Sequence, residues 1–215
     1  MAFPSVSWSD MTIGGQDPQF KTHNLTFKSV VSGHMVTFVA FLTDYSQNFS
    51  SNWSSEEVYG RADPLATYQG TKRTISLAWD VPARSISEAK NNMRLINSLV
   101  AMLYPGYSSQ PVTQGEQSII NASSISRSPL IKVKYKNLIQ DANSDTEGLL
   151  GYVDGFSVNT NLDMGMFDQD GDNVYPKVFS ISCNFNVLHQ HDLGFDKNNE
   201  WLDGDAYKKF VFGDE

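Results

Sequence analysis

The chain has 215 residues, 40% of them hydrophobic and 12% aromatic, and a formal net charge of −8. This composition supports a packed core, and the acidic balance argues against wrapping a nucleic-acid backbone, which needs clustered lysine and arginine. No apolar run approaches the ~18 residues of a membrane span, no secretory signal begins the chain, and one cysteine excludes an intrachain disulfide. We therefore expect a protein that folds in a reducing cytoplasm without a membrane anchor.

The first 43 residues predict two kinds of extended structure. Residues 1–34 place Trp8, Phe20 and Phe27 among glycine, serine and threonine, which indicates an N-terminal arm or short strands. Residues 35–43 are apolar, aromatic or β-branched on both faces, so they predict a strand that is covered on both sides.

Residues 44–70 mix large aromatic rings with serine, asparagine, glutamine and glutamate. The aromatic members are Tyr45, Phe49, Trp53, Tyr59 and Tyr68. We interpret the segment as a long loop, and a loop of this length in a compact domain is usually functional. Its composition is typical of protein–protein contact surfaces. The alternative is a meander of short irregular strands.

Residues 71–107 give the clearest local signals. The alternating residues place one set on one face and a second set on the other, which predicts a half-buried strand. The first set is Arg73, Ile75, Leu77 and Trp79, and the second is Thr74, Ser76, Ala78 and Asp80. Pro82 ends that strand because proline has no N–H for pairing.

A single amphipathic helix is expected at about residues 86–104. Ser85 and Glu88 form a capping box at its start, and Pro105 follows its end. Its apolar stripe comprises Ala89, Met93, Ile96, Leu99, Val100 and Leu103. Asn92 falls at the edge of this stripe, and we expect the stripe to pack on the strands.

The rest of the chain predicts further antiparallel strands. Residues 108–128 indicate a polar loop with a short strand at 118–120, and residues 130–138 alternate cleanly. Residues 149–159 place Leu150, Tyr152, Phe156 and Val158 on one face. Residues 168–173 predict a hairpin turn, and residues 175–188 predict the longest strand.

These elements predict a mainly β protein: an antiparallel β-barrel or β-sandwich with one flanking helix. We expect an N-terminal arm or short strands at 1–34, a β domain with the helix at 35–191, and an acidic, aromatic C-terminal tail at 192–215.

Side chains with reactive or metal-binding chemistry have a structural interpretation here. Cys183 lies on the apolar face of a strand, which favours a buried, inert thiol. His189 and His191 would share one face of an extended chain and could bind zinc, but further ligands at suitable spacing are missing. A polar strand end is therefore favoured.

Two charged runs also have a structural interpretation. Asp168, Asp170 and Asp172 resemble a calcium loop, but its glycine comes early and its distal glutamate is missing, so a solvated turn is favoured. Lys132, Lys134 and Lys136 form a basic stripe, which indicates a solvated face or half of a salt bridge between subunits. With no phosphate loop, nucleophile elbow or triad, we expect no enzyme, cofactor or metal.

A family resemblance enters at residues 57–83, through Tyr59-Gly60-Arg61, Asp63-Pro64 and the strand that begins at Thr71. Further matching segments are the helix end at 103–107 and residues 149–153, 176–183 and 189–194. The order of these segments resembles that of tail-tube and baseplate-tube proteins of contractile-tailed bacteriophages, including those that initiate the tube. The resemblance covers residues 38–195. It implies a β-barrel or sandwich with one helix, assembled as a ring, usually of six subunits, around a channel.

Two functional hypotheses follow. The first is a virion structural protein, assembled in the host cytoplasm, that forms a ring in the baseplate or tail tube and contacts neighbouring tail proteins. The genome would pass its lumen without sequence-specific binding. The second is a carbohydrate- or peptide-binding β-sandwich. The candidates for subunit or partner contacts are Tyr45, Phe49, Trp53, Tyr59, Arg61 and Trp201.

Overall fold

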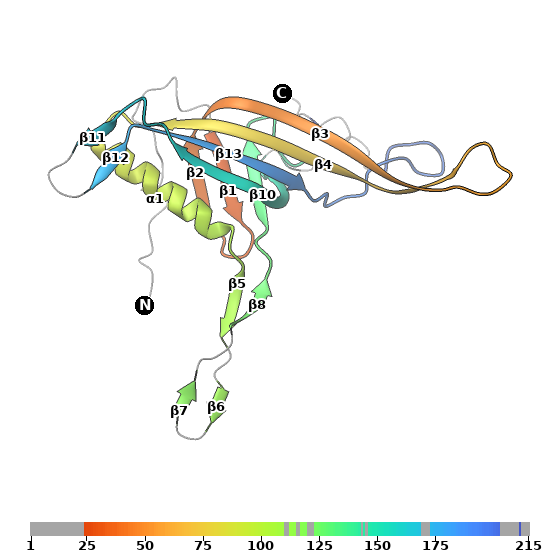
Figure 1. The fold of residues 1–215 in the computed structure, drawn as a ribbon, viewed down its shortest axis with the longest axis horizontal. Helices are drawn as coiled ribbons and strands as arrows, with labels where there is room; N and C mark the ends of the chain where they lie inside the picture. The colour runs from red at the N-terminus through yellow and green to blue at the C-terminus, as the bar shows by residue number, and fades with distance from the viewer. Residues whose placement is uncertain are drawn as a thin grey trace.

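The computed structural model describes residues 24–109, 112–114, 117–119, 123–142, 144, 146–168, 173–202 and 211. Its body is a seven-stranded antiparallel sheet with one helix, α1, Ile86–Met102 (Figure 1). The strand order is β2-β1-β9-β10-β13-β4-β3. These strands span Asn24–Ser29 (β1), Met35–Val39 (β2), Phe41–Glu56 (β3), Leu65–Pro82 (β4), Ile131–Tyr135 (β9), Leu149–Thr160 (β10) and Val178–Val187 (β13). The prediction of a mainly antiparallel β protein with one helix is confirmed.

The sheet is not closed into a barrel. Of the two predicted forms, a barrel or a sandwich, the barrel is therefore not formed. Among the described strands β2 and β3 are the two edges, although Ala40 alone separates them in the chain. In a flat sheet β1 and β4 would lie four strand spacings apart, about 19 Å. Instead the ring centroids of Phe27 and Trp79 are 5.6 Å apart, and those of Phe38 and Trp79 are 6.2 Å apart. The sheet therefore bends over its own core.

The core is built by alternate residues, as the sequence predicts. In β4, the side chains of Arg73, Ile75, Leu77 and Trp79 are all buried. Strand β13 buries every second residue from Phe179 to Val187, and β9 buries Ile131, Val133 and Tyr135. Each buried side chain removes apolar surface from water, which is the main stabilising contribution in such a fold.

Residues 44–70 are not a loop. Strands β3 and β4 pair from Phe41↔Asp80 to Glu56↔Leu65, and the turn between them occupies residues 57–64. Strand β13 pairs with β4 only from Pro82 to Thr74, so residues 49–73 project as a two-stranded ribbon (Figure 1). At ~3.3 Å per residue the projecting part of β4 is roughly 30 Å long. We call residues 49–73 the ribbon.

Two further strand predictions need correction. Residues 35–43 do not form one strand covered on both sides, because β2 ends at Val39 and only the alternate residues Val36, Phe38 and Ala40 are buried. In β10 the inward residues at the start are Leu149 and Gly151, whereas Tyr152 is 44% exposed. A Cβ at Gly151 would lie 2.2 Å from the Asn186 carbonyl oxygen, so glycine fills an inward position without giving an apolar signal.

A bulge later in β10 restores part of the predicted face. The register of β10 against β13 shifts between Asp154 and Ser157; Phe156, within this shift, and Val158, after it, pack against the core. A bulge reverses which residues point inward, so one alternation cannot describe the whole strand.

Helix α1 begins where the capping box predicts. Ser85 Oγ accepts the Glu88 N–H at 3.2 Å, and Glu88 Oε2 accepts the N–H of Arg84 at 2.7 Å. Its buried face is rotated from the expected stripe: Asn92 lies at its centre, fully buried, and donates through Nδ2 to the Pro82 carbonyl at 3.1 Å. The buried members of this face are Ala89, Asn92, Leu95, Ile96, Leu99 and Met102.

Three two-stranded sheets lie outside this seven-stranded sheet. Strands β5 (Gly106–Ser109) and β8 (Ser123–Arg127) pair, as do β6 (Val112–Gln114) and β7 (Gln117–Ile119), so the expected polar loop at 108–128 is largely paired. Strands β11 (Met166–Asp168) and β12 (Val174–Pro176) pair as the hairpin prediction requires. Asp170 and Asp172 lie outside the described residues. Within the described ranges, no helix has the length and apolarity to cross a membrane.

We expect Leu99→Ala to lower the free energy of unfolding by about 2–5 kcal/mol, the range for truncating a buried leucine. Leu99 is 0% exposed and belongs to the core that the helix shares with the sheet. Chemical denaturation measures the change. Ser98→Ala, at the preceding position, is the control and should change stability little, because the Ser98 hydroxyl is outside the buried face and donates to the Arg94 carbonyl at 2.9 Å. A loss below about 1 kcal/mol for Leu99→Ala would mean that the helix stripe is not core.

Candidate functional site

The outer part of the ribbon exposes aromatic side chains. Trp53 and Tyr68 are paired across its strands, with ring centroids 5.1 Å apart in an edge-to-face arrangement. They are 57% and 52% exposed, and Tyr59 in the turn is completely exposed. The Arg61 N–H donates to the Val58 carbonyl at 3.2 Å, which closes the turn and leaves the Arg61 side chain exposed. Trp53, Tyr59 and Arg61 are thus displayed together at the distal part of the ribbon.

The base of the ribbon is fastened to its own subunit. Tyr45 is partly buried, and its hydroxyl donates to the Leu138 carbonyl at 3.0 Å. Phe49 is 43% exposed, and its ring centroid lies 5.6 Å from the Arg73 guanidinium carbon. Of the predicted contact residues, Tyr45 and Phe49 therefore already have partners within the subunit.

Arg73 organises this base, a role that the sequence interpretation missed. Its side chain is 1% exposed; Nε donates to Gln47 Oε1 at 3.0 Å, and a terminal nitrogen donates to the Val211 carbonyl at 3.3 Å. Burial lowers the pKa of Arg73, the nearby Tyr45 opposing this. The signal was present in the sequence, because an arginine occupies an inward position of an alternating strand. Arg73 joins the ribbon base to the C-terminal part of the chain.

Trp201 lies in a small loop apart from the ribbon. It forms an isolated antiparallel bridge with Phe195, and the two ring centroids are 4.3 Å apart. Trp201 is 46% exposed and Phe195 is 58% exposed. The carboxylate of Asp196 accepts the N–H of Glu200 at 2.9 Å, which holds the loop between the two rings. Half of the predicted tail, 203–210 and 212–215, lies outside the described residues.

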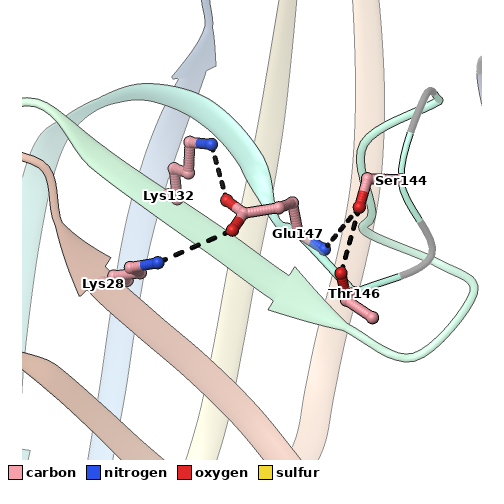
Figure 2. Close-up of polar contacts among 5 residues, drawn as sticks. All are labelled: Lys28, Lys132, Ser144, Thr146 and Glu147. Atoms are coloured by element: carbon pink, nitrogen blue, oxygen red, sulfur yellow. Dashed lines mark hydrogen bonds and ion pairs between the residues drawn. The ribbon is translucent and has the colours of Figure 1, made fainter.

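A second polar surface lies on the outer face of β1 and β9. Lys28 and Lys132 are cross-strand partners, and Glu147 lies over them (Figure 2). Glu147 accepts from Lys132 Nζ at 2.6 Å and is 3.6 Å from Lys28 Nζ. We call this surface the lysine groove; it is lined by Thr26, Lys28, Met35, Lys132, Lys134, Thr146, Glu147 and Gly148.

The loop before β10 fixes the carboxylate over the lysines. The Glu147 N–H donates to Ser144 Oγ at 3.3 Å, and Ser144 Oγ is 3.1 Å from Thr146 Oγ1 (Figure 2). The hydrogen bond and charge of Lys132, followed by the charge of Lys28, lower the pKa of Glu147. Lys132 and Lys134 of the predicted stripe line the groove, whereas Lys136 lies in the turn after β9. Lys28 was missed because sequence spacing does not place β1 beside β9.

The other candidate residues occupy ordinary structural positions. Cys183 is 3% exposed in β13, as predicted, and burial raises the pKa of its thiol to about 12. His189 and His191 follow β13 and line a small cavity with Arg73 and Asp141. Burial, Arg73 and His191 lower the pKa of His189. Among the described residues, no three His, Cys, Asp or Glu side chains are grouped so that they could hold a metal ion.

We expect Lys132→Met to raise the pKa of Glu147, because it removes both the hydrogen bond and the largest favourable charge. Carboxyl-carbon NMR titration measures this pKa, and Lys136→Met is a control outside the groove. Because the pKa of Glu147 is lower in the folded than in the unfolded protein, its ion pair stabilises the fold at pH values above the unfolded-state pKa. This contribution to stability is lost as the pH falls through the folded-state pKa. An unchanged Glu147 pKa in Lys132→Met would contradict the assigned ion pair.

No family model and no curated protein matches this chain. Among solved structures, the chain is similar to the SPP1 Dit protein, whose crystal structure is described as a paradigm of the hub adsorption apparatus in phages that infect Gram-positive bacteria. The TM-score is 0.41 with 8% identity, over 76% of this chain and 49% of that protein. This chain thus spans about half the length of the Dit protein, and a likeness this distant carries no argument about function.

Proposed function

We propose that this protein is a non-enzymatic structural component of a bacteriophage contractile tail, forming a ring in the baseplate or tail tube through which the genome passes. The resemblance over residues 38–195 supports the class of protein. The observation that carries the proposal is the ribbon, a long paired projection that exposes aromatic rings instead of burying them.

The ribbon has properties that a partner would complete. A two-stranded ribbon is marginally stable in water by itself, and its outer edges offer N–H and C=O groups for pairing. Trp53 and Tyr68 add the large amphipathic rings that are enriched at the centres of protein contacts. A neighbouring subunit or an adjoining tail protein would bury these rings and fix the ribbon.

The candidate contact residues divide into two roles under this proposal. Phe49, Trp53, Tyr59, Arg61 and Trp201 contact neighbouring proteins through their exposed surfaces. Tyr45 holds the ribbon base on its own subunit, through its hydrogen bond to Leu138. A ribbon of one copy that contacts a different surface of the next copy is a heterologous contact, and such contacts close into rings when the rotation permits.

Electron microscopy of the purified protein and of intact particles tests the proposal. We expect rings with a central channel, usually of six copies, and the same protein at the tail or baseplate of the particle. A monomer that responds to a carbohydrate or peptide ligand and is absent from particles would instead support the alternative, a ligand-binding β module.

We expect Trp53→Ala and Trp201→Ala each to fold with a cooperative thermal transition yet fail to enter particles. Each ring is about half exposed in the isolated subunit, and burying such a ring at a contact contributes about 2 kcal/mol or more. Quantifying the protein in purified particles measures incorporation.

Two further tryptophan and tyrosine variants serve as controls for this experiment. Tyr152→Ala, at a 44% exposed position of β10, should fold and enter particles normally. Trp79→Ala should destabilise the subunit itself, because Trp79 is 0% exposed. If Trp53→Ala or Trp201→Ala unfolds, that ring belongs to the subunit core, and wild-type incorporation would remove it from the contact.

A further inference from the structure

The lysine groove is a basic surface on an acidic protein. Lys28, Lys132 and Lys134 line it with one acidic residue, Glu147, which gives three positive charges and one negative charge. The chain without these four residues has 13 basic and 23 acidic residues, a net charge of −10. A positive surface of this kind attracts negatively charged protein segments and repels positive ones.

The ribbon turn carries the reverse combination of charges. Glu56, the last residue of β3, borders the turn at residues 57–64 and is exposed together with Glu57, Asp63 and Arg61. Residues 56–64, which we call the acidic turn, therefore carry three negative charges and one positive charge. The turn is formed by consecutive residues at the far end of the ribbon, so its charges are held within one small surface (Figure 1). Groove and turn are therefore complementary in both sign and number.

A subunit does not bring its own turn to its own groove. The groove lies on β1 and β9, whereas the ribbon leaves the sheet from β3 and β4, beyond β10 and β13 in the strand order. The ribbon extends away from β1 and β2 rather than back across them (Figure 1). An acidic turn that occupies the groove must come from another copy.

We propose that the lysine groove binds the acidic turn of a second copy of this chain. Glu56, Glu57 and Asp63 pair with the groove lysines, and Arg61 pairs with Glu147, which already lies at the groove surface between Lys28 and Lys132. Tyr59, fully exposed in the turn, covers the apolar side chain of Met35 in the groove. This inference rests on the proposed ring and names the surface on which its ribbon docks.

Charge reversal on both surfaces tests the inference. The groove variant is Lys28→Glu/Lys134→Glu, which retains the 2.6 Å pair between Lys132 and Glu147. The turn variant is Glu56→Lys/Glu57→Lys, and a quadruple variant combines both changes. Lys197→Glu/Arg127→Glu makes the same change in net charge at exposed positions outside the groove and is the matched control.

Self-association is measured by sedimentation velocity at low and at high salt, after circular dichroism has checked each fold. We expect the groove and turn variants to associate about tenfold or more weakly than wild type, because attraction becomes repulsion at two pairs. The quadruple variant restores association, the control resembles wild type, and high salt weakens wild-type association.

Each remaining outcome overturns the inference. The first is a groove or turn variant that associates as strongly as wild type. The second is a quadruple variant that folds but stays monomeric, and the third is a wild type that stays monomeric at its highest soluble concentration. Failure of the proposed function can be told apart from failure of the docking inference. If the quadruple variant restores association in solution, but the wild type forms no rings and is absent from particles, only the tail assignment is contradicted. If the Lys28→Glu/Lys134→Glu variant still forms rings and enters particles at wild-type levels, only the docking inference is contradicted.

Discussion

The contact of Trp79 with Phe27 and Phe38 is the interaction on which the rest of this structure depends. It joins β4 to β1 and β2, strands from opposite parts of the sheet, with ring centroids 5.6 and 6.2 Å apart. Because the sheet must bend to make this contact, its two edge strands can follow one another with only Ala40 between them. The bend leaves β3 and β4 to continue outward as the ribbon, while β1 and β9 keep an outer face for the lysine groove.

Arg73 marks the point where β4 changes from a core strand into a ribbon strand. Toward Trp79 the inward side chains are buried and β13 pairs along the strand; beyond Arg73 that pairing has ended. A buried guanidinium loses its hydration, so it requires hydrogen-bond acceptors and favourable contacts. Gln47, the ring of Phe49 and the Val211 carbonyl supply them. These contacts hold the base of a projection that a hairpin alone would hold weakly.

The division between the sheet body and the projecting ribbon places the lysine groove and the exposed ribbon residues in different parts of the fold. The body supplies the groove, in which Glu147 is fixed over Lys28 and Lys132 by its own loop. The ribbon supplies exposed rings and a charged turn. Under the proposed docking, the two surfaces would meet only between subunits, which is a heterologous contact, and such contacts close into a ring when the rotation permits.

The sequence by itself determined the local elements whose signals lie within a few residues. The capping box set the start of α1, and alternation identified the buried faces of β4, β9 and β13, because short-range spacing decides both. Only the tertiary structure decided the ribbon, since strands exposed on both faces leave no alternation to read. It also decided the inward position of Gly151, which has no side chain to signal burial, and the burial of Asn92, which depends on the distant Pro82 carbonyl. The lysine groove required the pairing of β1 with β9, because contacts between residues a hundred positions apart follow from sheet topology and not from spacing.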